Sequence, residues 1–172
     1  NQKIHLVECP RDAMQGWPHF IDTELKINYI NALLKVGFHT IDFGSFVSPK
    51  AIPQMRDTRE VLEKLDVGNG PEDTRLLAIV ANLRGAEEAV YYEKISYLGF
   101  PFSISETFQQ RNTNSSIADS FNVVDQIQQL CRTIEYPKIK LLRREVTFVV
   151  DSYTKNVIYP CHVVIGAVTT EL

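Results

Sequence analysis

Cysteine, long apolar runs and an excess of positive charge are all scarce in this chain. The 172 residues contain three cysteines, Cys9, Cys131 and Cys161, which are odd in number and widely spaced. This usage indicates a reducing compartment rather than a disulfide framework. We therefore expect a cytoplasmic protein, with the mitochondrial matrix as the alternative.

No apolar run approaches the roughly 18 residues that would span a bilayer, so we expect no membrane association. The 18 Lys and Arg residues are outnumbered by 21 Asp and Glu residues, for a net charge of −3. No basic run is interleaved with aromatic residues, which argues against a nucleic-acid-binding surface. The P-loop, GxGxxG, GxSxG and CxxC motifs are also missing.

What the chain does have is an ordinary globular composition, with 44% apolar and 23% charged residues. Its first 132 residues alternate β-rich runs with helical spacing. Strands are predicted at 3–9, 40–46, 76–81 and 95–100, and helices at 22–36, 55–65, 84–94 and 117–131. Strands separated by helices of this length predict right-handed βαβ units and a parallel sheet.

The pattern changes after residue 132. Two β-rich runs predict strands at 145–150 and 161–168, with no amphipathic helix between them. We interpret residues 1–132 as a series of βα units and residues 133–172 as a β-rich segment of the same domain.

Arg11 and Asp12 directly follow the first predicted strand, and parallel α/β folds place ligand sites at the carboxyl ends of strands. Asp12 could offer a carboxylate oxygen to Mg²⁺ or Mn²⁺. Arg11 is a permanent cation suited to a carboxylate or a developing enolate. The alternative is a surface Arg–Asp pair in a loop.

Asp42 lies in the second predicted strand, which is otherwise apolar. An unpaired carboxylate is costly there, so the side chain needs a partner. Arg11, at the end of the neighbouring strand, is the expected one. The alternative reading of this pair is a buried structural ion pair.

A third candidate region is polar and follows the fourth predicted strand, at 103–108 and 111–116. It could line the same opening, or it could be a solvated loop. Ser116, with Asp119 three residues further on, forms a capping-box pattern at the start of the last predicted helix.

The four histidines, His5, His19, His39 and His162, are isolated in the sequence and show no spacing that would place two on one metal. We interpret His5 and His39 as structural. Cys9 is predicted to be a packed strand residue.

Five ordered blocks of the sequence resemble hydroxymethylglutaryl-CoA lyases. They lie at 7–15 (VECPRDAMQ), 45–50 (SFVSPK), 53–55 (PQM), 82–85 (NLRG) and 105–116. The resemblance covers about residues 3–132. A lone Arg-Asp pair is shared by the wider group of metal-dependent Claisen-type aldolases and synthases, whereas five blocks in order are far more specific.

The resemblance implies a (β/α)₈ TIM-type barrel, of which this chain carries about the first half. It implies cleavage of 3-hydroxy-3-methylglutaryl-CoA, an acyl-CoA substrate, to acetyl-CoA and acetoacetate with Mg²⁺ or Mn²⁺. An open half-barrel also exposes a sheet edge, so we expect a homo-oligomer, in the simplest case a dimer.

The resemblance also implies roles for individual residues. Arg11 and Asp42 would be catalytic, Arg11, Gln15 and Ser45 would contact the substrate, and Asp12 would bind the metal. Asp42 stands where these lyases usually carry Glu, which is one methylene longer.

Other family features have no match in this chain. Ala13 replaces the glycine that usually follows Arg-Asp. The paired metal histidines of the family and its glycine-rich loop with a catalytic cysteine are not found, and Cys161-His162 reproduces neither motif. Two alternatives therefore stay open: a related aldolase or synthase acting on another acyl-CoA or 2-oxo acid, and a truncated half-barrel without catalytic activity.

Overall fold

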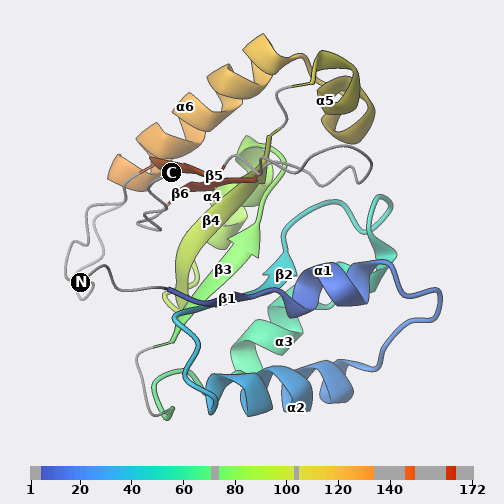
Figure 1. The fold of residues 1–172 in the computed structure, drawn as a ribbon, viewed down its shortest axis with the longest axis vertical. Helices are drawn as coiled ribbons and strands as arrows, with labels where there is room; N and C mark the ends of the chain where they lie inside the picture. The colour runs from blue at the N-terminus through green and yellow to red at the C-terminus, as the bar shows by residue number, and fades with distance from the viewer. Residues whose placement is uncertain (1–4, 71–73, 103–104, 134–145, 150–161, 166–172) are drawn as a thin grey trace. The chain divides into compact units, whose positions relative to one another are not determined.

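The computed structural model describes residues 5–70, 74–102, 105–133, 146–149 and 162–165 (Figure 1). These fall into two compact units. The first extends to Ile79 and includes Lys94–Ser96, and the second comprises Val80–Glu93 and the residues from Tyr97 onward. The division into 1–132 and 133–172 stays a prediction.

The first unit contains three parallel strands connected by helices. Its elements are β1 (Val7–Glu8), α1 (Pro10–Gln15), α2 (Thr23–Leu34), β2 (Thr40–Ser45), the short 3₁₀ helix η1 (Pro53–Met55), α3 (Thr58–Lys64) and β3 (Arg75–Ile79). Strand β2 pairs in parallel with β1 on one side and with β3 on the other. The predicted parallel βα arrangement is therefore confirmed.

Among its described residues, the second unit combines three helices with three strands. Its elements are α4 (Leu83–Ala89), β4 (Ile95–Pro101, whose first two residues belong to the first unit), α5 (Glu106–Thr113), α6 (Ile117–Thr133), β5 (Val146–Val149) and β6 (His162–Ile165). Strand β6 pairs antiparallel with both β4 and β5. Both strands expected after residue 132 are present, although parts of the ranges 145–150 and 161–168 lie outside the described residues.

Two helices occur where the sequence predicted loops. Helix α1 begins at Pro10, whose fixed φ suits the first helical position, but its six residues are too few to show a helical period. Helix α5 replaces the loop expected around 105–113, and its polar composition hides the period. The predicted cap of α6 is confirmed, because Ser116 Oγ accepts the Asp119 N–H at 3.0 Å.

The core of the first unit lies around β2, whose six residues are all buried. Ile41 and Phe43 belong to this core, together with Ile27, Ile30 and Leu34 of α2. Helix α2 packs against β2 and against α3. Each such side chain contributes roughly 1.5–3 kcal/mol when it is fully buried, so β2 is the strand on which the unit is built.

Strand β2 contains an irregularity next to Asp42. Asp42 lies opposite Leu77 and Gly44 lies opposite Ala78, so β2 has one extra residue relative to β3 at this point. Bulges of this kind bend a strand and change the direction of nearby side chains. A Cβ atom on Gly44 would lie 2.8 Å from Thr58 Cγ2, so glycine is needed for β2 to approach the start of α3.

No helix among the described residues is both long enough and apolar enough to cross a membrane.

We predict that Gly44→Ala destabilises the protein by about 1–3 kcal/mol, because the added methyl group overlaps the Thr58 side chain. Thr58→Ser removes the nearest methyl group and keeps the hydroxyl, which accepts the Ser45 N–H and donates to the Met55 carbonyl. The double variant Gly44→Ala/Thr58→Ser should therefore regain part of the loss in urea unfolding. If Gly44→Ala alone were as stable as the unchanged protein, the close approach would be wrong.

Candidate functional site

The candidate site is built on α1, which begins two residues after β1 ends. Arg11 and Gln15 are four residues apart on this helix and therefore lie on the same face. Strand β2, next to β1, carries Asp42. Because the two strands run in parallel, their carboxyl ends bring these side chains to one edge of the sheet.

A buried ion pair joins α1 to β2. Arg11 Nη2 donates to Asp42 Oδ2 at 2.6 Å, and Arg11 Nε lies 3.1 and 3.2 Å from the two carboxylate oxygens. Arg11 and Asp42 are each only 4% exposed. The pairing expected from the sequence is therefore present, and the aspartate reaches the guanidinium although it is one methylene shorter than glutamate.

The other side of the guanidinium faces α1 itself. Arg11 Nη1 donates to Asp12 Oδ1 at 3.1 Å and to Gln15 Oε1 at 2.9 Å. Gln15 Nε2 in turn donates to Asp12 Oδ1 at 3.3 Å. The structure thus brings Arg11, Asp12, Gln15 and Asp42 together, and we call these four residues the Arg11 cluster. Asp12 is its exposed member, since half of its side chain remains accessible.

Arg11 remains a permanent cation in this setting. Burial by itself would lower the pKa of the guanidinium, but the hydrogen bonds and charge of Asp42, aided by Asp12, raise that pKa above its usual value. Of the five N–H groups of a guanidinium, the contacts above engage Nε–H, both Nη1–H groups and one Nη2–H. Within the described part of the chain, one Nη2–H therefore has no hydrogen-bond acceptor among these contacts.

Ser45 takes a different position from the other predicted site residues. It lies at the end of β2, is buried, and its hydroxyl donates to the Ile79 carbonyl of β3 at 3.3 Å. Its backbone N–H donates to Thr58 Oγ1. These contacts hold the end of β2 against β3 and α3 and do not join Ser45 to the Arg11 cluster.

Cys9 is exposed and precedes α1, which corrects the prediction of a packed strand residue. The strand ends at Glu8, so Cys9 leaves the sheet. Although part of its surface is accessible, atoms packed around the sulfur displace water, and this desolvation raises the pKa of the thiol to about 11. The negative charge of Asp42 adds to the rise. Cys9 is therefore a neutral thiol at pH 7.

The histidines of the described residues do not join the site. His5 and His39, 34 positions apart in sequence, meet with ring centroids 3.9 Å apart, and His39 Nδ1 lies 2.8 Å from Thr40 Oγ1. His162 belongs to β6, whose side chains lie outside the described residues. Within the described ranges, no three His, Cys, Asp or Glu side chains are grouped so that they could hold a metal ion.

The third candidate region lies in the second unit and makes polar contacts there. Gln109 of α5 is buried, and its Nε2 donates to Thr113 Oγ1 at 2.9 Å and to Ser120 Oγ at 2.8 Å. The Ile117 N–H donates to the Glu106 carboxylate. These contacts fix α5 against the start of α6.

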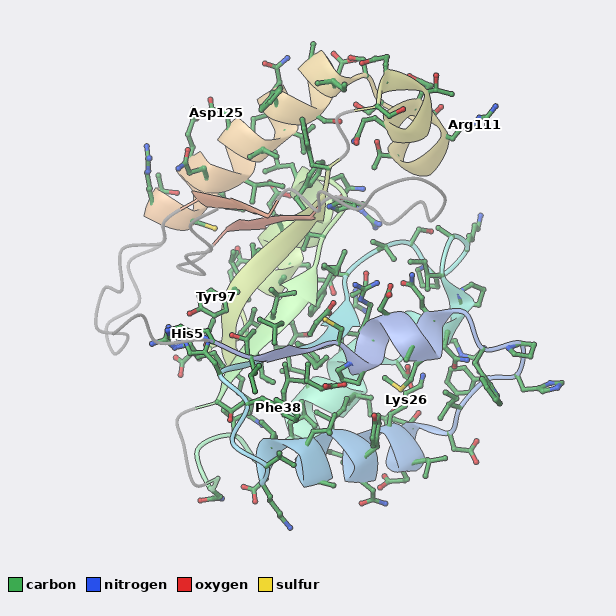
Figure 2. The ribbon with its side chains drawn as sticks, in the orientation of Figure 1. His5, Lys26, Phe38, Tyr97, Arg111 and Asp125 are labelled. Atoms are coloured by element: carbon green, nitrogen blue, oxygen red, sulfur yellow. The ribbon has the colours of Figure 1, made fainter. Side chains whose placement is uncertain are left out.

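Sequence reasoning missed a second polar network, which lies next to α1. Lys26 and Gln54 are both buried, and Lys26 Nζ forms an ion pair with Asp57 Oδ1 at 2.7 Å. Lys26, labelled in Figure 2, lies four residues before Ile30 on the buried side of α2. A lysine at an inward helical position is a signal that a buried partner exists, as the carboxylate at position 42 was for Arg11.

Parallel strands alternating with helices, with charged side chains gathered where β1 and β2 end, are typical of parallel α/β proteins. Likeness to solved structures places the chain in the TIM-barrel class, of which it carries the first half. Comparison with known proteins narrows this class. No family model matches the chain.

Similar curated proteins are hydroxymethylglutaryl-CoA lyases. The mitochondrial enzyme of Rattus norvegicus is 34% identical over 134 residues, which cover 76% of this chain and 39% of the relative. The enzyme YngG of Bacillus subtilis is 37% identical over 127 residues, covering 73% of this chain and 41% of the relative. This chain therefore spans about two fifths of the length of the curated relatives it matches.

Solved structures give the same result. An HMG-CoA lyase from Acinetobacter baumannii, in complex with coenzyme A and 3-methylmalate, matches with a TM-score of 0.69 at 35% identity over 74% of this chain and 41% of that one. The Bacillus subtilis HMG-CoA lyase matches with a TM-score of 0.70 at 34% identity, over 77% of this chain and 43% of that one. The resemblance and the fold class predicted from the sequence are confirmed.

The pKa of Cys9 offers a test of the charges in the cluster. We expect alkylation of Cys9 by iodoacetamide to rise with pH around a midpoint near 11, because the thiolate is the reactive form. Asp42→Asn removes a negative charge near the sulfur and should lower this midpoint. The rate is measured on the Cys9 peptide by mass spectrometry.

Asp125→Asn, on the exposed side of α6, is the matched control and should leave the midpoint unchanged. A midpoint in Asp42→Asn equal to that of the unchanged protein would show that the Asp42 charge does not act on Cys9.

Proposed function

We propose that the full-length protein is a carbon–carbon lyase that cleaves 3-hydroxy-3-methylglutaryl-CoA to acetyl-CoA and acetoacetate. The observation that carries this proposal is the Arg11 cluster, which lies within the part of the chain that matches hydroxymethylglutaryl-CoA lyases. A solved relative that binds coenzyme A and 3-methylmalate supports an acyl-CoA substrate that also carries a carboxylate.

Arg11 would stabilise negative charge on the substrate. In the cleavage, the substrate hydroxyl loses its proton and becomes the ketone carbonyl of acetoacetate as the C–C bond breaks. The electrons of that bond move onto the thioester to form an enolate, which takes up a proton to give acetyl-CoA. A fixed cation with a free N–H favours that developing charge, because it is oriented in advance and excluded from bulk water. The buried position of Arg11 and its remaining Nη2–H support this role.

Asp42 and Gln15 would act through Arg11. Asp42 fixes the guanidinium plane by contacts to Nε and Nη2, and Gln15 receives a hydrogen bond from Nη1. Gln15 would also contact the substrate beside Arg11. Ser45 would contribute to substrate binding from the end of β2, although its hydroxyl donates to a backbone carbonyl in this structure.

We also propose that the protein uses Mg²⁺ or Mn²⁺ and that Asp12 supplies one ligand. A carboxylate oxygen is the donor that these hard cations prefer. Asp12 fits as a single ligand, because half of its side chain is accessible while Arg11 and Gln15 contact only Oδ1. The other described residues do not complete a metal site around it.

A divalent ion bound there would lower the pKa of a hydroxyl group that it contacts. Asp12 would hold the ion, and the hydrogen bond that its carboxylate accepts from Arg11 Nη1 would keep this carboxylate oriented.

The compartment and the assembly belong to the same proposal. Similar rat proteins are named as a mitochondrial and as a cytoplasmic form, so similarity does not distinguish these compartments. We propose a cytoplasmic protein on the basis of its cysteine usage, and we propose that it forms a homodimer.

The proposed activity is tested by measuring acetoacetate release from 3-hydroxy-3-methylglutaryl-CoA by the full-length protein. We expect release with Mg²⁺ or Mn²⁺, loss of release with a chelator, and recovery when the metal is restored. A panel of other 3-hydroxyacyl-CoA and 2-oxo acid substrates is run in parallel. No metal-dependent release from any of them would overturn the lyase proposal, and release from another substrate alone would assign a related aldolase.

Arg11→Lys tests whether stabilisation of the enolate needs the geometry of the guanidinium or only a positive charge. Lysine keeps the positive charge but cannot contact Asp42 and Gln15 in the same two-sided geometry. We expect kcat to fall by about 10²–10³, with a smaller change in KM. Arg132→Lys, on the exposed end of α6, is the control and should leave kcat unchanged. A kcat for Arg11→Lys within twofold of the unchanged protein would contradict the role.

A further inference from the structure

Gln54 of η1 holds the chain that follows α1. Its side-chain Oε1 accepts the Ile21 N–H at 2.9 Å, and its Nε2 donates to the carbonyls of His19 at 2.8 Å and Trp17 at 3.3 Å. Gln54 is only 5% exposed. One buried amide thus binds three backbone groups within five consecutive residues, which we call the 17–21 segment.

The 17–21 segment continues directly from the helix that carries the Arg11 cluster. The Trp17 N–H donates to the Met14 carbonyl at 3.0 Å, so the first residue of the segment closes the last turn of α1. Helix α1 has six residues, far fewer than a helix needs to be stable by itself in water. The position of α1 therefore depends on contacts at both of its ends. The Arg11–Asp42 pair supplies only the contact near the start of the helix.

A second layer of contacts supports Gln54 itself. Lys26 Nζ donates to the Gln54 backbone carbonyl at 2.5 Å and to Asp57 Oδ1 at 2.7 Å. Two cations lie against the ring of Phe20, within the 17–21 segment: Lys26 Nζ is 4.2 Å and Arg56 Cζ 3.7 Å from its centroid. The segment is thus held by η1 and α2 together.

We propose that Gln54 is a positioning residue of the candidate site. Its amide fixes the 17–21 segment and thereby holds the far end of α1, which carries Arg11, Asp12 and Gln15. The effect of Gln54 on catalysis rests on the proposed lyase function, whereas its effect on the position of α1 does not.

The chemistry of the three bonds explains why glutamine is needed. Two N–H donors meet two carbonyl oxygens, and one oxygen acceptor meets one N–H. Methionine has a similar length but forms none of these bonds. Glutamate keeps the acceptor, but its carboxylate would face the two carbonyl oxygens without a donor.

The single tryptophan of the chain makes the segment directly observable. Trp17 is the only tryptophan, and its side chain is 61% exposed. In Gln54→Met we expect a larger fast component in the nanosecond anisotropy decay of Trp17, and exchange of the Ile21 amide hydrogen about tenfold faster than in the unchanged protein. In Gln54→Glu the Trp17 motion should rise similarly, while Ile21 exchange changes less because its acceptor remains.

The Arg11 side chain supplies the readout at the site. Arg11 Nε–H donates to the Asp42 carboxylate and should give a slowly exchanging resonance in ¹⁵N spectra. We expect its exchange with water to become faster in Gln54→Met. Val61→Ala is the matched control, because it truncates a buried apolar side chain of α3 in the same unit, and this side chain cannot hydrogen-bond to the segment. It should lower stability without changing Trp17 motion or Arg11 exchange under native conditions.

Turnover by the full-length protein completes the test. If Gln54 positions the cluster, kcat should fall in Gln54→Met while KM changes less. The proposal is overturned if Trp17 motion and Arg11 exchange are unchanged in both Gln54 variants, or if Val61→Ala changes them equally. It is also overturned if Trp17 motion and Arg11 exchange change in a Gln54 variant whose kcat equals that of the active, unchanged protein. A protein that releases no acetoacetate overturns the lyase proposal alone, because the fluorescence and exchange readouts need no substrate.

Discussion

The buried ion pair between Arg11 and Asp42 is the contact on which the first unit and its candidate site both depend. Strand β1 has two residues and α1 has six, so neither is stable without tertiary contacts. The pair ties both to β2, the strand at the centre of the unit. Removing either partner would leave an unpaired charge in a buried position, which typically costs about 3–5 kcal/mol. The residue proposed to stabilise charge in the reaction is thus also a structural anchor.

The sequence was sufficient to predict this pair, for a definite physical reason. A carboxylate in an apolar strand needs a partner, and Asp42 is the only charged residue of β2. Parallel strands place their carboxyl ends side by side, so a cation just beyond β1 is the nearest candidate. A local pattern also predicted Ser116 as the cap of α6. The cap needs only a short stretch of sequence, whereas the pair, 31 positions apart, was predictable because a parallel arrangement of β1 and β2 brings the two strand ends together.

Other features depend on contacts that no short stretch contains. Gln54 is an unremarkable polar residue in sequence, because its three backbone partners lie 33 to 37 positions earlier in the chain. The bulge between Asp42 and Gly44 arises from pairing with β3 and from the closeness of Thr58. Helices α1 and α5 are too short or too polar to show a period. The prediction for Cys9 was wrong because β1 ends at Glu8, one residue before the end of the predicted strand.

The charges of the cluster explain why a cation would matter to the proposed reaction. Arg11 carries one positive charge, and Asp12 and Asp42 carry one negative charge each, which leaves a net charge of −1 at the site. Such a site repels an anionic acyl-CoA even though it contains a suitable arginine. A divalent ion on Asp12 would reverse the sign to +1 without disturbing the buried pair, because Asp12 is the exposed member. In the proposed reaction, the buried Asp42 would therefore have a structural role and the exposed Asp12 a ligand-binding role.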